Sequence, residues 1–240
     1  MRVDSEPAFV LHARPYRETS QLVDVFTRHH GRFRTVAKGF RRARAASRHL
    51  SPFAPLLVSW TGKGDLKNLI NTEQAGASFM LSGDRLYSGL YLNELLLRLL
   101  AENDPHLRLF DHYLEVLQKL ASDEPIEPPL RKFEFCLLDE IGYGLAVDVD
   151  AMTGEPISLE SWYWFDPSMG FVAGHKSSDN HRSPNWFHGA ELLSIHEARD
   201  HSAAVGRTKK RLMRLAIQSH IGAKPLRSRE LFAALPKVEQ

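Results

Sequence analysis

The sequence lacks the features of several large classes of proteins. Among its 240 residues there is one cysteine, Cys136, so no disulfide can form within the chain, which favours a reducing compartment. No apolar run approaches the roughly 18 residues of a membrane span, and the first residues carry no signal-peptide hydrophobic segment. We therefore expect a cytoplasmic protein that contacts no membrane.

The motifs of common enzyme classes are also missing. The chain has no GxSxG elbow, no GxxxxGKS/T phosphate loop and no GxGxxG after a strand. Its 12 histidines form no HxxxH pair with a glutamate, and its carboxylates show no spacing typical of an acid–base pair or a two-metal site. We expect no catalytic residue, no cofactor and no metal; a metal held by histidines far apart in the sequence is the alternative.

Acidic residues are absent from a long stretch of the N-terminal third. Residues 1–80 have 13 Lys and Arg against 6 Asp and Glu, residues 81–160 have 6 against 16, and residues 161–240 have 12 against 7. Between Asp24 and Asp65 there is no acidic residue. Because each region sets its own local field, a basic head, an acidic middle and a basic tail suggest separate surfaces with separate partners.

The first 80 residues show the short runs typical of β-strands, separated by turn signals such as His30-Gly31. Five short strands in so short a segment predict a small closed or partly closed barrel, for which the OB-fold is the commonest form that binds nucleic acids. The expected strands are Ala8–Ala13, Gln21–Arg28, Arg32–Gly39, Pro55–Trp60 and Leu66–Thr72.

Basic side chains gather in the acid-free stretch and just beyond it. Lys and Arg attract the phosphates of a nucleic acid with release of counterions, so the number of cations along one path sets the affinity. In the third expected strand, Arg32, Arg34 and Lys38 share one face, and Arg41–Arg48 resembles a loop that can follow a backbone. A solvated surface is the alternative. The predicted binding residues are Arg28, Arg32, Arg34, Lys38, Arg41, Arg42, Arg44, Arg48, Lys63 and Lys67.

Aromatic residues are interleaved with these cations. They are either stacking surfaces for unpaired bases or the core of the barrel, and the core is the favoured interpretation. The residues concerned are Phe26, Phe33, Phe40, Phe53 and Trp60.

From Leu86 onward the apolar spacing becomes helical. Asp104-Pro105 ends the first helix, and Gly142-Tyr143-Gly144 is a helix stop rather than a phosphate cradle. The irregular segment 145–187 contains one expected hairpin, Trp162–Phe165 with Phe171–Ala173. The other expected helices are His106–Ala121, one that starts near Pro129, Gly189–Glu197, Val205–His220 and Ser228–Leu235.

A second basic cluster lies on the expected helix Val205–His220. Arg207, Arg211 and Arg214 share one face, opposite the apolar side of the helix. The cluster is a further candidate for contact with nucleic acid, and a solvated helix face is the alternative. The predicted binding residues are Arg207, Lys210, Arg211 and Arg214.

Several blocks, in order along almost the whole chain, resemble the RecO family of bacterial recombination mediators. The blocks are Phe9–Ser20, Phe26–Arg32, Pro52-Phe53, Trp60–Leu66, Gly89–Leu96, Arg131–Glu134, Gly142–Leu145 and Lys224–Leu231. The resemblance implies an N-terminal OB-fold, a helical domain and a small inserted module that is a zinc ribbon in many members.

The resemblance also implies a role in DNA repair without catalysis. The expected activities are binding of single- and double-stranded DNA, annealing of complementary strands, and help in loading the recombinase onto strands coated by single-strand-binding protein. The implied partners are RecR and the acidic, hydrophobic C-terminal tail of single-strand-binding protein, and the implied location is the cytoplasm, at the nucleoid. For the tail we expect a site at Arg131, Lys132 and Phe133, where a cation adjoins an apolar side chain; helix-surface charge over a core phenylalanine is the alternative.

The insert departs from the family pattern. Members with zinc carry a CxxC pair just after the GYGL motif, where this chain has Asp150-Ala151-Met152-Thr153, and it has no second pair after the hairpin. Four thiolates close a structural zinc site, and none is available here. We expect the insert to be held by packing of Trp162, Trp164, Phe165 and Phe171 instead.

Together these observations predict an α+β protein. The expected domains are an OB-fold at 1–80, a helical domain at 81–144 and 188–240, and a metal-free, ribbon-like insert at 145–187. The main alternative function is a non-catalytic scaffold that binds protein partners through its helices and has only incidental affinity for DNA. A metal-dependent nuclease or ligase accessory enzyme is a third hypothesis.

Overall fold

The computed structural model describes residues 1–39, 50–175, 183–196, 202–222 and 224–233. The chain divides into two compact units. The barrel unit comprises Met1–Ile126 together with Pro225–Gln240, and the ribbon unit comprises Glu127–Lys224. The domains expected from the sequence separate the barrel from the helices at residue 80. The compact units instead group the barrel with the two helices that follow it. No helix within the described residues is long and apolar enough to cross a membrane.

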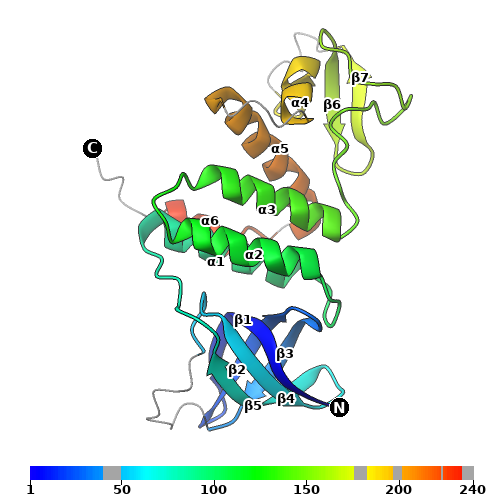
Figure 1. The fold of residues 1–240 in the computed structure, drawn as a ribbon. Helices are drawn as coiled ribbons and strands as arrows, with labels where there is room; N and C mark the ends of the chain where they lie inside the picture. Colours follow the sequence, from blue (N-terminus) through cyan, green and yellow to red (C-terminus); the bar gives the residue numbers. More distant parts are fainter. Residues whose placement is uncertain (40–49, 176–182, 197–201, 223, 234–240) are drawn as a thin grey trace. The chain divides into compact units, whose positions relative to one another are not determined.

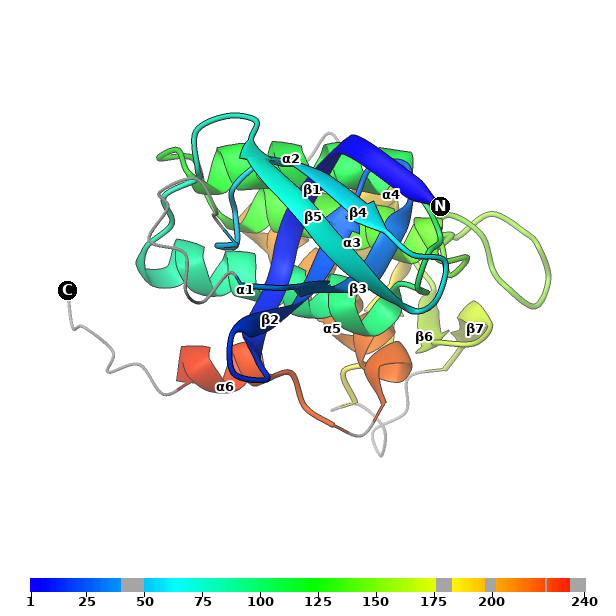
Figure 2. The ribbon, with the colours of Figure 1, turned by 90° about the horizontal axis from the view of Figure 1, so that it is seen from below.

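Five strands close the N-terminal barrel in the order β1-β2-β3-β5-β4 (Figure 1, Figure 2). The long first strand pairs antiparallel with both β2 and β4, and β3 pairs parallel with β5. This five-stranded closed barrel confirms the expected OB-fold. The strands are β1 (Arg2–Tyr16), β2 (Ser20–Thr27), β3 (Gly31–Ala37), β4 (Leu56–Thr61) and β5 (Leu66–Gln74).

The first strand is bent so that it can serve two neighbours. Its register shifts between Val3 and Glu6 against β4, and between Val10 and His12 against β2. Such bulges increase the local bend and twist of a strand, which a closed barrel requires. The interior is filled by alternate, fully buried side chains; they include Val10, Val23, Val25, Phe33, Val58 and Trp60.

Two helices of the barrel unit cover one end of the β1–β2 surface. These are α1 (Gly83–Leu99) and α2 (Leu107–Leu120). The ring of Phe9 in β1 lies 5.0 Å from that of Tyr113, and the ring of Phe26 in β2 lies 5.4 Å from that of Phe110. Asn93 of α1 donates a hydrogen bond to the carbonyl of Leu11 at 3.0 Å. These contacts bury outward-facing barrel residues, so this part of the surface is closed to a ligand.

The last helix also belongs to the barrel unit. Helix α6 (Arg227–Ala233) begins against α1, where the Glu94 carboxylate accepts hydrogen bonds from the backbone of Arg227 and Ser228 at 3.0 and 2.9 Å. Burial alone would raise the pKa of Glu94, but these bonds and the neighbouring Arg98 lower it.

The ribbon unit combines three helices with a small antiparallel sheet of order β7-β6-β8. The expected hairpin forms β6 and β7, and the third strand, which the sequence did not indicate, is only three residues long. The elements are α3 (Glu127–Glu140), β6 (Trp162–Asp166), β7 (Gly170–Gly174), β8 (Trp186–His188), α4 (Gly189–His196) and α5 (Ala203–Ile221).

The end of α3 is the expected helix stop. Gly142 has a φ of 84°, and the backbone N–H groups of Gly142 and Tyr143 bond back to Asp139 and Leu138 at 3.0 and 2.8 Å. A left-handed residue with these back-bonds is the usual helix C-cap, and glycine adopts it without steric cost.

Candidate nucleic-acid interface

Part of the outer barrel surface remains open beyond the helices. Along the cross-strand register, Phe9, Phe26 and Arg32 form a covered row, whereas His12 and Arg34 belong to the next outward-facing row. In OB-folds, the face of strands 2 and 3 and the adjoining loops contact oligonucleotides. The open row therefore lies where such a fold binds nucleic acids.

A buried carboxylate holds the arginine of this row. Asp24 of β2 has a side chain only 8% exposed, and it accepts a hydrogen bond from Nε of Arg34 at 3.1 Å. The Arg34 side chain is 42% exposed. The Nδ1 atom of His12 lies 4.0 Å from the other Asp24 oxygen. Because one edge of the guanidinium is anchored, Arg34 reaches the surface in a fixed orientation, which suits contact with a phosphate.

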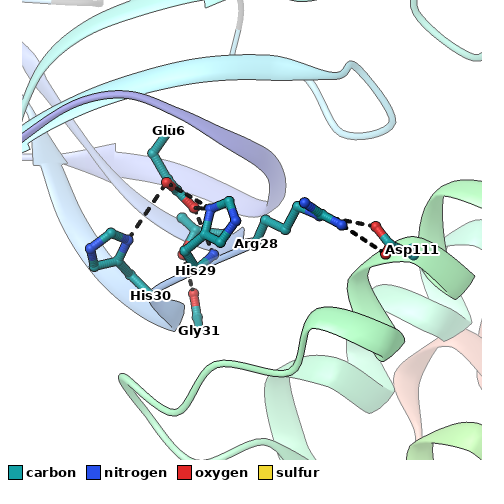
Figure 3. A network of polar contacts seen from close by, with 7 residues as sticks. Glu6, Arg28, His29, His30, Gly31 and Asp111 are labelled. Atoms are coloured by element: carbon teal, nitrogen blue, oxygen red, sulfur yellow. Dashed lines mark hydrogen bonds and ion pairs between the residues drawn. The ribbon is translucent and has the colours of Figure 1, made fainter.

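Arg28, directly after β2, pairs with a residue of α2 at the surface of the barrel unit (Figure 3). Its Nε and Nη2 atoms donate to the two oxygens of Asp111 at 3.1 and 3.0 Å. These hydrogen bonds from Arg28 hold the pKa of Asp111 below its ordinary value and raise that of Arg28. Arg28 therefore joins the barrel to the helices in this structure.

The turn after Arg28 is organised by Glu6 of β1 (Figure 3). One Glu6 oxygen accepts from the backbone N–H of His29 at 2.7 Å and lies 3.1 Å from Nδ1 of the same residue. The Nδ1 atom of His30 lies 3.7 Å from the other oxygen. The carboxylate thus fixes the start of β3.

Two further predicted cations lie inside the barrel unit. Arg32 has a side chain 10% exposed, and it donates to the carbonyl of Leu100 at 3.1 Å and to Glu102 at 3.3 Å. Lys67 is buried over the ring of Phe33, with its Nζ 4.2 Å from the ring centroid and bonded to the Asn103 side chain. Burial lowers the pKa of Lys67. Arg32 lies on the expected side of β3, but the segment 100–104 covers it, so the cationic face begins at Arg34.

The remaining barrel cations occupy different places. Lys38 and Lys63 are exposed, the first directly after β3 and the second shortly after β4. Arg14 is exposed on β1, two residues beyond His12, and it is missing from the predicted set because it lies outside the acid-free stretch. Four predicted residues, Arg41, Arg42, Arg44 and Arg48, lie outside the described residues.

The described aromatic residues of the barrel are core. Phe26, Phe33 and Trp60 are fully buried, and Phe53 is 6% exposed. The favoured interpretation is confirmed for these four, and none of them presents a face to an unpaired base. Phe40 lies outside the described residues.

In the ribbon unit, the predicted cations of α5 differ in their surroundings. Arg207 and Arg214 are exposed, and Lys210 forms an ion pair with Glu127 of α3. Arg211 bonds Glu191 of α4 at 3.0 Å and packs over Phe187 at 4.1 Å from its ring centroid. Arg207 and Arg211 line a pocket of about 460 Å³ between α4 and α5. Helix α5 contains no acidic residue, but Glu191 of α4 also lines the pocket, so the pocket carries charges of both signs.

The residues expected to bind a protein tail open α3. Phe133 is 1% exposed and belongs to the core, while Lys132 is exposed. The guanidinium of Arg131 is held between Glu127 and the buried Glu134. Lys132 and Phe133 are thus adjacent in sequence, but only Lys132 is exposed at the surface of α3, where a partner could contact it.

Comparison with known proteins matches nearly the entire chain. Residues 1–77 match the family described as Recombination protein O N terminal, and residues 80–230 match Recombination protein O C terminal.

Curated proteins with the name DNA repair protein RecO are similar over almost their full length. The protein of Stutzerimonas stutzeri (strain A1501) is 46% identical over 232 residues, which cover 96% of this chain and 94% of that protein. The protein of Cellvibrio japonicus (strain Ueda107) is 45% identical over 234 residues, with 97% and 98% covered. The protein of Haemophilus influenzae (strain 86-028NP) is 44% identical over 234 residues, with 97% of each chain covered.

Proposed function

The chain belongs to the RecO family of DNA repair proteins, and we propose that it is a non-catalytic recombination mediator. In this proposal it binds single- and double-stranded DNA, anneals complementary strands, and assists loading of the recombinase onto strands coated by single-strand-binding protein. Its site of action is the DNA of the nucleoid in the cytoplasm.

The observation that carries the proposal is the open face of the OB-fold around Arg34. Arg34 of β3, anchored by Asp24 of β2, provides a surface for phosphates together with Arg14, which is exposed on β1 on the other side of β2, and Lys38 beyond the end of β3. The acid-free sequence between Asp24 and Asp65 supports the same interpretation. Arg28, Arg32 and Lys67 are engaged within the unit, so the proposal does not depend on them.

The exposed cations of α5 are proposed as a second contact with DNA. Arg207 and Arg214 lie on a helix without acidic residues, in a different compact unit from the barrel. A protein that holds two complementary strands needs more than one cationic surface, because each strand carries its own phosphates.

The proposed protein partners are RecR and the C-terminal tail of single-strand-binding protein. For the tail, the support is the exposed Lys132 at the start of α3, whose positive charge suits a terminal carboxylate. The neighbouring Arg131 is already held by Glu127 and Glu134. Phe133 contributes to such a site only as part of the core beneath it.

An annealing assay tests this function. The full chain is mixed with complementary labelled strands, with and without single-strand-binding protein, and compared with a variant carrying Arg14→Ala, Arg34→Ala and Lys38→Ala. We expect the chain to accelerate annealing and the variant to lose most of the effect, because fewer phosphates are neutralised. The matched control is Lys119→Ala, which removes an exposed cation already paired with Glu115 and Glu124.

One observation favours the scaffold alternative. Three of the predicted DNA-binding cations make contacts within the barrel unit instead. A scaffold would bind protein partners but would leave the annealing rate of the naked strands unchanged. That outcome would exclude the mediator function proposed here.

A further inference from the structure

The open row of the outer barrel surface contains a histidine that lies before the acid-free stretch of the sequence. In the cross-strand register, His12 of β1 lies opposite Asp24 of β2, and Asp24 lies opposite Arg34 of β3. These side chains are on the outer side of the barrel, because the adjacent residues Val23 and Phe33 belong to its core. One carboxylate therefore lies between two basic side chains from the neighbouring strands.

The carboxylate of Asp24 faces its two neighbours with different oxygens. Its Oδ1 atom accepts the hydrogen bond from Nε of Arg34 at 3.1 Å, and its Oδ2 atom lies 4.0 Å from Nδ1 of His12. The side chain of Asp24 is buried, whereas that of His12 is 55% exposed and that of Arg34 is partly exposed. The two basic groups can therefore meet a ligand in solvent, and the carboxylate beneath them is covered.

The protonation state of His12 decides the net charge of this row. Asp24 cancels the charge of Arg34, so the three groups together are neutral while the imidazole is neutral. When the imidazole takes up a proton, the row carries one net positive charge, located on the more exposed of its two basic side chains. Phosphates bind where a net positive charge and a reachable donor coincide. Imidazoles ordinarily change charge between about pH 5 and pH 8.

Within the described residues, the neighbouring strands add no second carboxylate to the row. Asp24 is the one charged residue in the sequence of β2. On β1, Arg14 is exposed two residues beyond the histidine and is positive at any pH in this range. On β5, the residue opposite Arg34 is Leu66, and the preceding Asp65 acts on Lys67 instead.

The helices that approach this part of the barrel have their charged groups paired elsewhere. Helix α1 contacts β1 through the uncharged Asn93, and its Glu94 is bound by Arg98 at 3.1 Å and by the start of α6. On α2, Asp111 is paired with Arg28. The charge of the row is therefore set by its own three members and by Arg14.

We propose that His12 is a phosphate contact of the DNA-binding face, and that DNA binding at this face is coupled to uptake of a proton by its imidazole. This inference rests on the proposed DNA-binding function and adds to it a residue and a dependence on pH. The ligand is the phosphodiester backbone rather than the bases. Because coupling between two ligands is reciprocal, the proton raises the affinity for DNA by the same factor by which DNA raises the affinity for the proton.

The pH dependence of DNA binding tests the inference. Fluorescence anisotropy measures the affinity of the full chain for labelled oligodeoxythymidylate, whose bases do not titrate near neutral pH, at constant salt and at about pH 6 and about pH 8. We expect tighter binding by the wild type at the lower pH. His12→Ala should lose about two- to fivefold of this gain, which is the range for one exposed ion pair.

Two further variants identify the charge as the cause. His12→Arg carries a permanent cation, so at the higher pH it should bind about as tightly as the wild type does at the lower pH. Its remaining pH dependence should equal that of His12→Ala. The matched control is His112→Ala, which removes a histidine of α2 whose Nδ1 atom lies 2.9 Å from the carbonyl oxygen of Arg108. This control should keep the wild-type pH dependence, and circular dichroism identifies any variant that fails to fold.

Calorimetry measures the proton directly. The heat of DNA binding is recorded near neutral pH in two buffers with different ionisation enthalpies, and the difference gives the number of protons taken up on binding. The wild type should take up more protons than His12→Ala and His12→Arg, which should agree with each other. A merely structural role of His12 would change the affinity equally at both pH values and would leave the proton uptake unchanged.

The outcomes distinguish this inference from the function on which it rests. If His12→Ala keeps the pH dependence and the proton uptake of the wild type, the inference is overturned and DNA binding stands. Binding by His12→Arg that is no tighter than that of the wild type at the higher pH would overturn it as well, because no phosphate would then lie at this position. If the wild type binds the oligonucleotide at neither pH, the DNA-binding function fails and the inference fails with it.

Discussion

Arg32 and Arg34 lie two positions apart on β3 and face the same side of the barrel, yet their neighbours differ. Arg32 meets the segment after α1 and bonds the carbonyl of Leu100, whereas Arg34 meets Asp24 and stays at the surface. Period-two alternation gives both residues the same direction. The alternation does not show which part of that face is covered by a segment distant in the sequence. Contacts with such segments therefore decide whether an arginine has a structural role or is a candidate binding residue.

Gly31, at the start of β3, is also constrained by a segment distant in the sequence, and the substitution Gly31→Ala tests this constraint. Gly31 has a φ of 68°, and a Cβ atom there would lie 2.1 Å from the carbonyl oxygen of Asp104. We expect the substitution to lower the free energy of unfolding by about 3 kcal/mol or more, because left-handed strain adds to a backbone clash. Denaturant unfolding followed by circular dichroism measures it.

Gly39 is the matched control for this prediction. It has a φ of 73°, but no atom of the described residues lies within 4 Å of a Cβ at this position. Gly39→Ala should therefore cost only the strain of the left-handed conformation, about 1 kcal/mol. Equal losses in the two variants would contradict the close approach of Asp104 to the start of β3.

Among the elements, the insert illustrates how a single carboxylate can link a loop to a sheet. Asp150 lies in the loop before β6, where the resemblance to the family led us to compare the chain with a cysteine pair. Its carboxylate accepts hydrogen bonds from the backbone N–H groups of Met152 at 2.8 Å, Thr153 at 3.2 Å and Ala173 at 2.8 Å. The last bond ties the preceding loop to β7. One carboxylate thus links the loop to the strand.

Replacing this carboxylate should loosen the ribbon unit. We expect Asp150→Ala to lower its stability by about 2–4 kcal/mol, because three backbone donors lose a charged acceptor. Unfolding followed by tryptophan fluorescence reports on this unit, which contains Trp162, Trp164 and Trp186. Glu155→Ala, at an exposed position of the same loop, is the control and should have little effect. A wild-type melting curve in the first variant would contradict the role of Asp150.

The same carboxylate gives the ribbon unit a defined response to acid. Burial alone would raise the pKa of Asp150, but the three backbone bonds lower it below the ordinary value of 3.8. A depressed pKa in the folded state stabilises the fold above the unfolded-state pKa, and this contribution disappears as the pH falls through the folded value. Stability measured between pH 7 and pH 2 should therefore converge for the wild type and Asp150→Asn at the acid end. A constant difference across this range would contradict the prediction.

At the scale of the whole molecule, cations are distributed over two compact units. Arg34, Lys38 and Lys63 belong to the barrel unit, and Arg207 and Arg214 to the ribbon unit. If both surfaces bind one single strand, the numbers of phosphates that they neutralise should add.

We expect Arg207→Ala with Arg214→Ala to reduce the slope of log affinity against log salt by about 0.7 for each phosphate that the variant no longer neutralises. Combining these changes with Arg34→Ala should reduce the slope further by a similar amount per phosphate. Fluorescence anisotropy with a labelled single strand at several salt concentrations measures the slopes. Lys119→Ala again serves as the control, and an unchanged slope in the combined variant would show that phosphates bind elsewhere.

The sequence by itself determined the architecture of this protein. The five strands of the barrel, the helices and the β6–β7 hairpin follow from alternation, helical spacing and turn residues, which are local signals. The stop at Gly142 follows from the conformational freedom of glycine. The short strand β8 was not predicted from the sequence, because three residues are too few to show an alternating pattern.

Only the tertiary structure decided the role of individual side chains. It placed Arg32 and Lys67 under the segment 100–104, paired Arg28 with Asp111, and buried the aromatic residues of the barrel. It also brought Trp162 and Trp164 together with Trp186 from another strand. The composition gives the number of charged and aromatic residues. Whether a cation pairs with a carboxylate, and whether an aromatic ring is exposed to solvent, depends on contacts between residues distant in sequence.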